Sequence, residues 1–442
     1  MIIQLSDHFT YKRLLRFTLP SIAMMIFTSI YGVVDGFFVS NFVGKIPFAA
    51  VNFIMPFLML LGAFGFMFGT GGSALISKTM GEGDMPRANR LFSLLTYVTV
   101  ATGVILAALG MLFIRPIAAR LGAEGEMLND CVTYGRIILL ALPFFMLQME
   151  FQSFFVTAEK PQTGFYATVA AGVTNMVLDA LFIAVFQWGI VGAAAATATS
   201  QLVGGVIPLV YFGRKNTSLL RLGRTVFDGR ALLKTCTNGS SELMSNLSMS
   251  LVGMLYNVQL MKYAGEDGVA AYGVLMYVCF IFIAVFIGYS IGVAPVIGYH
   301  LGANNHDELK SLLKKSVLLL TLTSMGMVFL SLGLAKPLSL LYVGYDPALF
   351  EMTLRGFIFT SFSFMFSGIA IFGSGFFTAL NNGLVSATMS FLRTLVFQVA
   401  AILLLPLLWE LDGIWASIIA AEVAAASVTV TFLVAMRKRY HY

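Results

Sequence analysis

The sequence predicts an all-α integral membrane protein, with twelve transmembrane helices in two pseudo-symmetric bundles of six. Three observations lead to this fold class. Hydrophobic residues make up 58% of the 442 residues and charged residues only 11%, against roughly 25% charged in an ordinary soluble domain. Apolar stretches long enough to cross a bilayer recur along the whole chain. The second half of the chain also repeats the residue pattern of the first.

The repeat has a constant spacing of 221 residues. Its matched positions are mostly glycines, prolines and tryptophans, including Gly44 with Gly265, Gly81 with Gly302, Pro116 with Pro337, Gly135 with Gly356, and Trp188 with Trp409. Halves that share these residues carry the same series of helices. We therefore expect an N-terminal lobe over residues 1–213, a cytoplasmic connector over 214–236 and a C-terminal lobe over 237–442. Duplicated transporters often bind their ligands between such halves.

Each span needs about 20 residues to cross a hydrocarbon layer of about 30 Å. Charged residues and Gly, Pro or Asn breaks separate the candidates. The first lobe has spans near 14–39, 48–76, 91–114, 130–157, 163–187 and 190–212. The second has spans near 237–262, 269–299, 313–335, 348–380, 384–408 and 413–436.

Lysine and arginine residues give the orientation. An even number of spans puts both termini on one side, and 20 of the 27 lysines and arginines fall on that side when Arg393 is counted there. Basic residues accumulate on the cytoplasmic side, so we expect a multi-pass protein of the inner (cytoplasmic) membrane with both termini in the cytoplasm. The positive charge then has a topological role, and no nucleic acid is expected as a partner.

Other chemistry finds little support in the sequence. Three scattered cysteines predict neither a disulfide framework nor a metal cluster. There is no phosphate-binding Gly-Lys-Ser/Thr loop and no nucleophile–base constellation. We therefore expect no enzyme activity and no cofactor, and we expect a monomer in the bilayer.

Five acidic residues fall inside the predicted spans, namely Asp35, Glu150, Asp179, Glu242 and Glu422. A charge at the centre of a membrane helix costs on the order of 2.5–3.5 kcal/mol, so each of these acids needs a reason. No lysine or arginine is expected at a comparable depth, because Arg393 and the other bases are assigned to span ends. The acids must then be protonated, bind a metal ion, face water or meet a cationic ligand.

The N-terminal lobe supplies the most specific group of these residues. Asn175 and Asp179 are four positions apart and project from one face of the fifth span. Thr197 on the sixth span and Asp35 on the first would complete a small pocket of oxygen atoms. Such oxygens suit a proton or a hard cation, including Na⁺. The alternative is that either acid only forms a hydrogen bond between helices.

Other residues leave more alternatives open. Glu242 and Glu422 are candidates for acids that line a cavity in the C-terminal lobe, or for structural hydrogen-bonding groups. A structural role is expected for Glu150. Pro20 lies fifteen residues before Asp35 on the first span, where it removes a backbone hydrogen bond and favours a bend. Either a moving bend or a static kink fits the sequence.

The chain resembles the multidrug and toxic compound extrusion (MATE) family over nearly its whole length, and most of all its DinF-like bacterial branch. The resemblance is carried by Thr18-Leu19-Pro20 with Val34-Asp35-Gly36-Phe37-Phe38, Thr70-Gly71-Gly72-Ser73 with Gly81-Glu82-Gly83-Asp84, Thr174-Asn175-Met176-Val177-Leu178-Asp179 with Gly192-Ala193-Ala194, and Gly413-Ile414-Trp415 with Ala421-Glu422.

The resemblance implies an antiporter that exports cationic, amphipathic compounds by alternating access, in exchange for H⁺ or Na⁺. It places the coupling-ion site of the family on Asp35, Asn175, Asp179 and Thr197, and its bending helix on Pro20. Glu242 matches an acid of the NorM-like members. The tenth span has no deep acid, since Glu351 lies at its outer end, so the sodium site of the NorM-like C-terminal lobe is not fully matched.

The main competing function is a flippase for lipid-linked oligosaccharide, from the same superfamily of duplicated bundles. An anionic diphosphate substrate requires arginine or lysine side chains facing the cavity. The acids assigned to the interior favour an organic cation instead. A passive channel is the remaining alternative, and it would not depend on an opposing ion gradient.

Overall fold

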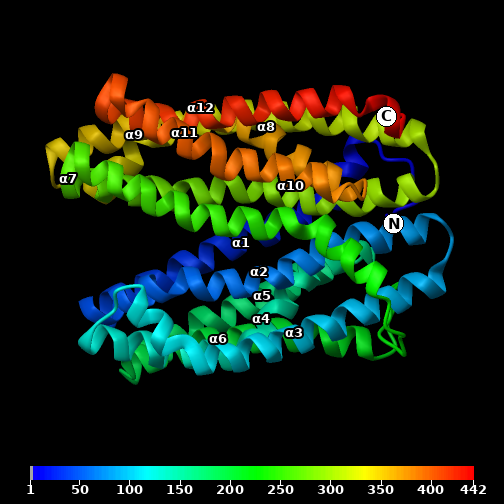
Figure 1. Ribbon diagram of the computed structural model, residues 1–442, viewed down its shortest axis with the longest axis horizontal. Coiled ribbons are helices and arrows are strands. Elements are labelled where there is room, and N and C mark those ends of the chain that lie inside the picture. Colours follow the sequence, from blue (N-terminus) through cyan, green and yellow to red (C-terminus); the bar gives the residue numbers. More distant parts are fainter. Residues whose placement is uncertain (1–2) are drawn as a thin grey trace.

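The structure, a computed structural model, describes residues 3–442, and within that range it contains helices and no strand. The helices form two elongated bundles, one from each half of the chain (Figure 1). Both termini lie at the same end of the molecule. The all-α integral membrane fold is therefore confirmed, because eleven of the helices are long and apolar enough to cross a bilayer.

The N-terminal lobe contains six spans, the fifth of which ends in a short π-helix. They are α1 (Tyr11–Phe42), α2 (Lys45–Gly81), α3 (Met85–Arg120), α4 (Gly125–Thr157), α5 (Pro161–Asp179) with η1 (Ala180–Val185), and α6 (Gly189–Gly213).

The C-terminal lobe contains α7 (Gly229–Gly302), α8 (His306–Val343) and α9 (Pro347–Ala379). These are followed by α10 (Gly383–Phe391), the π-helix η2 (Leu392–Val396) and α11 (Phe397–Leu404), which together form one span. The chain ends with α12 (Pro406–Ala435) and the short α13 (Arg437–Tyr440).

The 74-residue helix α7 is two spans joined at a break. Its backbone leaves the helical region at Gly265, where φ is 64° and ψ is −153°. The break occupies the same place in the repeat as Gly44, between α1 and α2, where φ is 116°. Glycine adopts positive φ without the steric penalty that a side chain brings. Counted on either side of Gly265, the spans number twelve in residues 3–442, as the sequence predicts.

The segment between the lobes is shorter than the range 214–236 given to it above, because α7 already begins at Gly229. The non-helical part is fixed along α3 by hydrogen bonds. The backbone N–H of Arg221 donates to Asn89 Oδ1 at 2.7 Å, and the hydroxyl of Tyr97 donates to the carbonyl of Gly223 at 2.9 Å. The connector is therefore an ordered part of the N-terminal lobe.

The two lobes pack closely at the end that carries the termini. Gly81 on α2 lies so near α7 that an added Cβ would overlap the carbonyl oxygen of Tyr299, and Gly302 on α7 has the same relation to Lys78. The side-chain amide of Asn381 donates to the carbonyl of Ala74 across this seam at 2.9 Å. Toward the other end the bundles diverge (Figure 1). The structure is therefore closed at the end of the termini.

The N-terminal segment, residues 3–10, adds a further connection between the lobes at the closed end. Leu5 and Phe9 are fully buried. The backbone N–H of Leu5 donates to Glu159 Oε1 of the N-terminal lobe at 2.6 Å. The backbone N–H of Phe9 donates to Glu308 Oε1 of the C-terminal lobe at 2.9 Å. This segment therefore ties the first helix to both bundles.

Candidate functional site

Three helices of the N-terminal lobe bring the predicted site residues together. Asp35 lies on α1, Asn175 and Asp179 lie one turn apart on α5, and Thr197 lies on α6. The hydroxyl of Thr197 donates to Asp35 Oδ1 at 3.4 Å. The side chains of Asn175 and Asp179 lie beside the same carboxylate. The structure thus assembles the four residues, while their role in binding an ion stays a prediction.

Local packing explains why α5 can approach α1. Gly172 faces α1, and a Cβ at this position would overlap the rings of Phe27 and Tyr31. Two turns further along α5, Asp179 is the last α-helical residue before η1 begins at Ala180. A π-helical turn inside an α-helix is rare and frequently marks a functional site. The change in helical register occurs directly at the acidic residue.

The buried oxygen atoms of this cluster lack partners. Asp179 is fully buried and Asn175 is 2% exposed. Both carboxylate oxygens of Asp179, together with Asn175 Oδ1, are buried without a hydrogen-bond partner. Buried polar atoms are normally paired, because an unpaired one costs on the order of 1–3 kcal/mol. Three such acceptors beside the Asp35 carboxylate are the atoms that a proton or Na⁺ would satisfy.

Two tyrosines border the cluster, and sequence reasoning did not select them. The side-chain amide of Gln148 contacts the Tyr31 hydroxyl at 3.5 Å, and Tyr31 lies one turn before Asp35 on α1. Tyr134 on α4 is 1% exposed and its hydroxyl is buried without a partner. Only Tyr31 could have been found from the sequence. It is four residues before Asp35, and residues at this spacing share a helix face.

Pro20 lies away from the cluster, in the half of α1 that packs against the C-terminal lobe. The helix runs from Tyr11 to Phe42 through Pro20 without an interruption. Before Pro20, Thr18 packs against Gly292 of α7, and after it, Ile22 packs against Gly288. An added Cβ at either glycine would crowd the α1 backbone. Whether α1 bends at Pro20 during a transport cycle stays a prediction.

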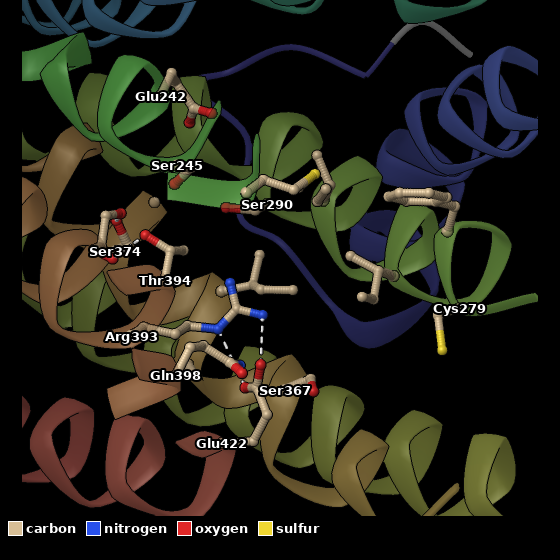
Figure 2. Close-up of a pocket in the computed structure, with 18 of the residues that line it drawn as sticks. Glu242, Ser245, Cys279, Ser290, Ser367, Ser374, Arg393, Thr394, Gln398 and Glu422 are labelled. Carbon is tan, nitrogen blue, oxygen red and sulfur yellow. Dashed lines mark hydrogen bonds and ion pairs between the residues drawn. The ribbon is translucent and has the colours of Figure 1, made fainter. Parts of the chain in front are cut away.

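A cavity with about 260 Å³ of space for the centres of water molecules lies mainly in the C-terminal lobe. Glu242 on α7 and Glu422 on α12 both line it, so the cavity-lining alternative fits both positions. Figure 2 shows Glu242 on one side and Glu422 on another, among serine and threonine side chains. The N-terminal lobe contributes Thr70, Ser73 and Ser153 to the lining.

The expectation that no basic residue lies deep in the spans is wrong for Arg393. This residue is within η2, in the middle of the span formed by α10, η2 and α11. Its guanidinium makes a two-point contact with Glu422, with Nε to Oε2 at 3.1 Å and Nη2 to Oε1 at 2.9 Å (Figure 2). Arg393 therefore does not belong to the residues that orient the protein, and Glu422 is neutralised by an ion pair.

Glu150 is enclosed by neighbouring helices, while the structural role expected for it stays a prediction. It is fully buried in α4, and its Oε1 accepts a hydrogen bond from the hydroxyl of Thr99 at 3.0 Å. A Cβ at Gly69 of α2 would overlap the backbone of Glu150, so three helices enclose this acid. It does not reach water within the described part of the chain.

Comparisons with known proteins agree with the duplicated architecture. The family profile named MatE matches residues 20–181 and, a second time, residues 243–404. "Multidrug export protein MepA" of Staphylococcus haemolyticus (strain JCSC1435) is 25% identical over 431 residues, covering 97% of this chain and 94% of that protein.

Solved structures have the same fold. A crystal structure described as MATE in the straight conformation superimposes with a TM-score of 0.91 at 21% identity, covering 98% of each chain. A structure described as the outward-facing conformation of a multidrug resistance MATE family transporter of the MOP superfamily gives a TM-score of 0.90 at 22% identity, again covering 98% of each chain.

Proposed function

The chain belongs to the MatE family, and from this premise we propose that it exports cationic, amphipathic compounds in exchange for H⁺ or Na⁺. The observation that carries the coupling is the cluster of Asp35, Asn175, Asp179 and Thr197, with three buried oxygen acceptors that have no hydrogen-bond partner. The similarity to a multidrug export protein supports the choice of cargo.

The cluster provides a reason for ion binding. Two carboxylates side by side in a largely buried site repel each other when both are ionised, and a proton or Na⁺ between them relieves the repulsion. Asn175 Oδ1 and the Thr197 hydroxyl would supply the remaining oxygen ligands. For exchange, the ion and the cargo must favour opposite states of the lobes, and their effects on each other's affinity are then reciprocal.

The closed seam at one end supports alternating access. The lobes are in contact where the termini lie and diverge toward the other end (Figure 1), and residues of both lobes line the cavity. Transport then requires the seam to open and the other end to close. One charge that moves through 100 mV gains about 2.3 kcal/mol, so one ion in each cycle can drive accumulation.

The experiment is efflux from liposomes that contain the purified protein. Ethidium is the reporter, and pH and sodium gradients are applied separately. We expect efflux to require one of the gradients and to fall to the level of empty liposomes in Asp35→Asn and Asp179→Asn. Glu351→Gln, which changes an exposed acid on α9, is the control and should keep its activity. Full activity of both aspartate variants would contradict the site.

The flippase alternative is less well supported by the charges of the cavity. Arg393 is the one base among the residues that line it, and Glu422 neutralises this base. A diphosphate would find no free positive charge there. A protein that translocates lipid-linked oligosaccharide between leaflets and fails to export ethidium would reverse this ranking.

A further inference from the structure

Three charged residues line the cavity of the C-terminal lobe, and they are not equivalent. They are Glu242, Arg393 and Glu422. The Arg393 and Glu422 side chains are 18% and 7% exposed and pair with each other. Glu242 makes no side-chain hydrogen bond or ion pair with residues 3–442, although its side chain lines the cavity (Figure 2). The lining therefore offers one acid that has no charged partner.

The pair is held in place by the helices around it. Arg393 projects from η2, and the adjoining turn carries Gln398, whose Oε1 accepts a hydrogen bond from the Tyr256 hydroxyl at 2.9 Å. Tyr256 also bonds Ser417 of α12 at 2.7 Å. These bonds join α7, α11 and α12 on the same side of the cavity. In this state the ion pair thus belongs to one wall of the cavity.

Flat aromatic side chains also line the cavity. The rings of Tyr256 and Tyr272 are stacked with their centroids 5.2 Å apart, and both residues line the cavity. Phe364, which also lines it, stacks on Phe282. Aromatic faces attract organic cations through the ring quadrupole and also bind the apolar part of such a molecule. The cavity therefore suits a flat aromatic cation.

We propose that Arg393 sets the charge of the cargo by masking Glu422, so that the C-terminal cavity selects organic cations with a single positive charge, which it holds against Glu242. Without Arg393 the cavity would offer two free acids and would match a dication. This inference rests on the proposed export of organic cations and adds a selectivity rule and the residue that enforces it.

Ethidium and propidium test the rule, since they share one phenanthridinium ring and carry one and two positive charges. Their dissociation constants are measured by fluorescence with the purified protein in detergent. We expect the wild type to prefer ethidium. Arg393→Gln should shift the ratio of the two constants toward propidium by roughly tenfold or more, because a unit charge a few ångströms away is only partly screened in a protein.

Three further variants separate selectivity from damage to the fold. The double change Arg393→Gln with Glu422→Gln restores one free acid and avoids a buried unpaired charge, so it should return the ratio to the wild-type value. Glu422→Gln alone leaves Arg393 unpaired and should weaken both cations, propidium more. Glu242→Gln should weaken ethidium by roughly tenfold.

The outcomes distinguish the two levels of the proposal. If the wild type binds ethidium and the ratio is the same in wild type, Arg393→Gln and Glu422→Gln, the masking role is refuted while cation export stands. If neither dye binds the wild type, both proposals are refuted. A shift in Arg393→Gln that the double change reverses supports the selectivity rule.

Discussion

Replacing Glu308 with alanine should move the protein toward a state that is open at the end of the termini. Glu308 is a buried residue in the first turn of α8, and its carboxylate accepts the backbone N–H of Phe9 at 2.9 Å. Its other oxygen contacts His8 Nδ1 at 2.6 Å. Phe9 belongs to the segment that continues into α1, so these contacts join the two lobes and must break when the seam opens.

The size of the effect follows from the environment of each contact. A hydrogen bond to a charged group contributes about 1.5–3 kcal/mol, and the N–H of Phe9 is buried with its residue. The contact with His8 adds less than about 1 kcal/mol, because the His8 side chain is 67% exposed. We therefore expect Glu308→Ala to disfavour the closed seam by about 2 kcal/mol, which changes the ratio of the two states about 30-fold.

Distances between spin labels report this ratio directly. On a background without Cys131, Cys236 and Cys279, one pair of labels is placed at Arg87 and Lys310, which are exposed near the closed end. In Glu308→Ala the population of long distances for this pair should rise.

A second pair at the other end and a matched control complete the design. Labels at Arg120 and Tyr345, exposed at the far ends of the lobes, should move closer together in Glu308→Ala. Asp307→Ala changes the neighbouring exposed acid in the same helical turn and should leave both distance distributions unchanged. Identical distributions in wild type and Glu308→Ala would refute the argument that this contact stabilises the closed seam.

Two other changes probe the same end of the molecule. Burial raises the pKa of the Glu159 carboxyl, in the turn between α4 and α5, above its ordinary value. The stability that this group contributes to the folded protein is therefore present below the ordinary carboxyl pKa, and it is lost as pH rises through the raised pKa. Thermal unfolding should thus show Glu159→Gln gaining stability relative to wild type as pH increases, and a constant difference across pH would contradict this. Gly81→Ala should force the seam apart in the same spin-label measurement, because the added Cβ would overlap the carbonyl of Tyr299. Gly326 has open space around it, so Gly326→Ala should behave as wild type.

The duplication explains why so much of the fold was predictable. Gly44 and Gly265 occupy the same place in the two halves, and both adopt positive φ between spans. A break that is ambiguous in one half is thus identified by its counterpart. Asp35, Asn175, Asp179 and Thr197 were predictable as a group because acids in apolar spans are rare and four-residue spacing fixes a helix face.

The parts that the sequence did not reveal depend on partners from distant segments. Arg393 was assigned to a span end, although its partner Glu422 lies on another helix, and only the packed lobe brings them together. The N-terminal segment was not predicted to join the lobes, because its bonds to Glu159 and Glu308 come from backbone N–H groups. Such groups are present in every residue except proline and leave no pattern in the sequence.

The π-helical turns have a mechanical consequence for both binding regions. Asp179 immediately precedes one of them, and Arg393 lies within the other. Such a turn holds one more residue than the α-helical turn it replaces. If the extra residue moves along the helix, each residue that it passes rotates by about 100° around the axis, while the residues beyond it and the loops at the ends of the span stay where they are. Each lobe thus has the means to turn a charged side chain toward or away from its ligand by a local change within one helix.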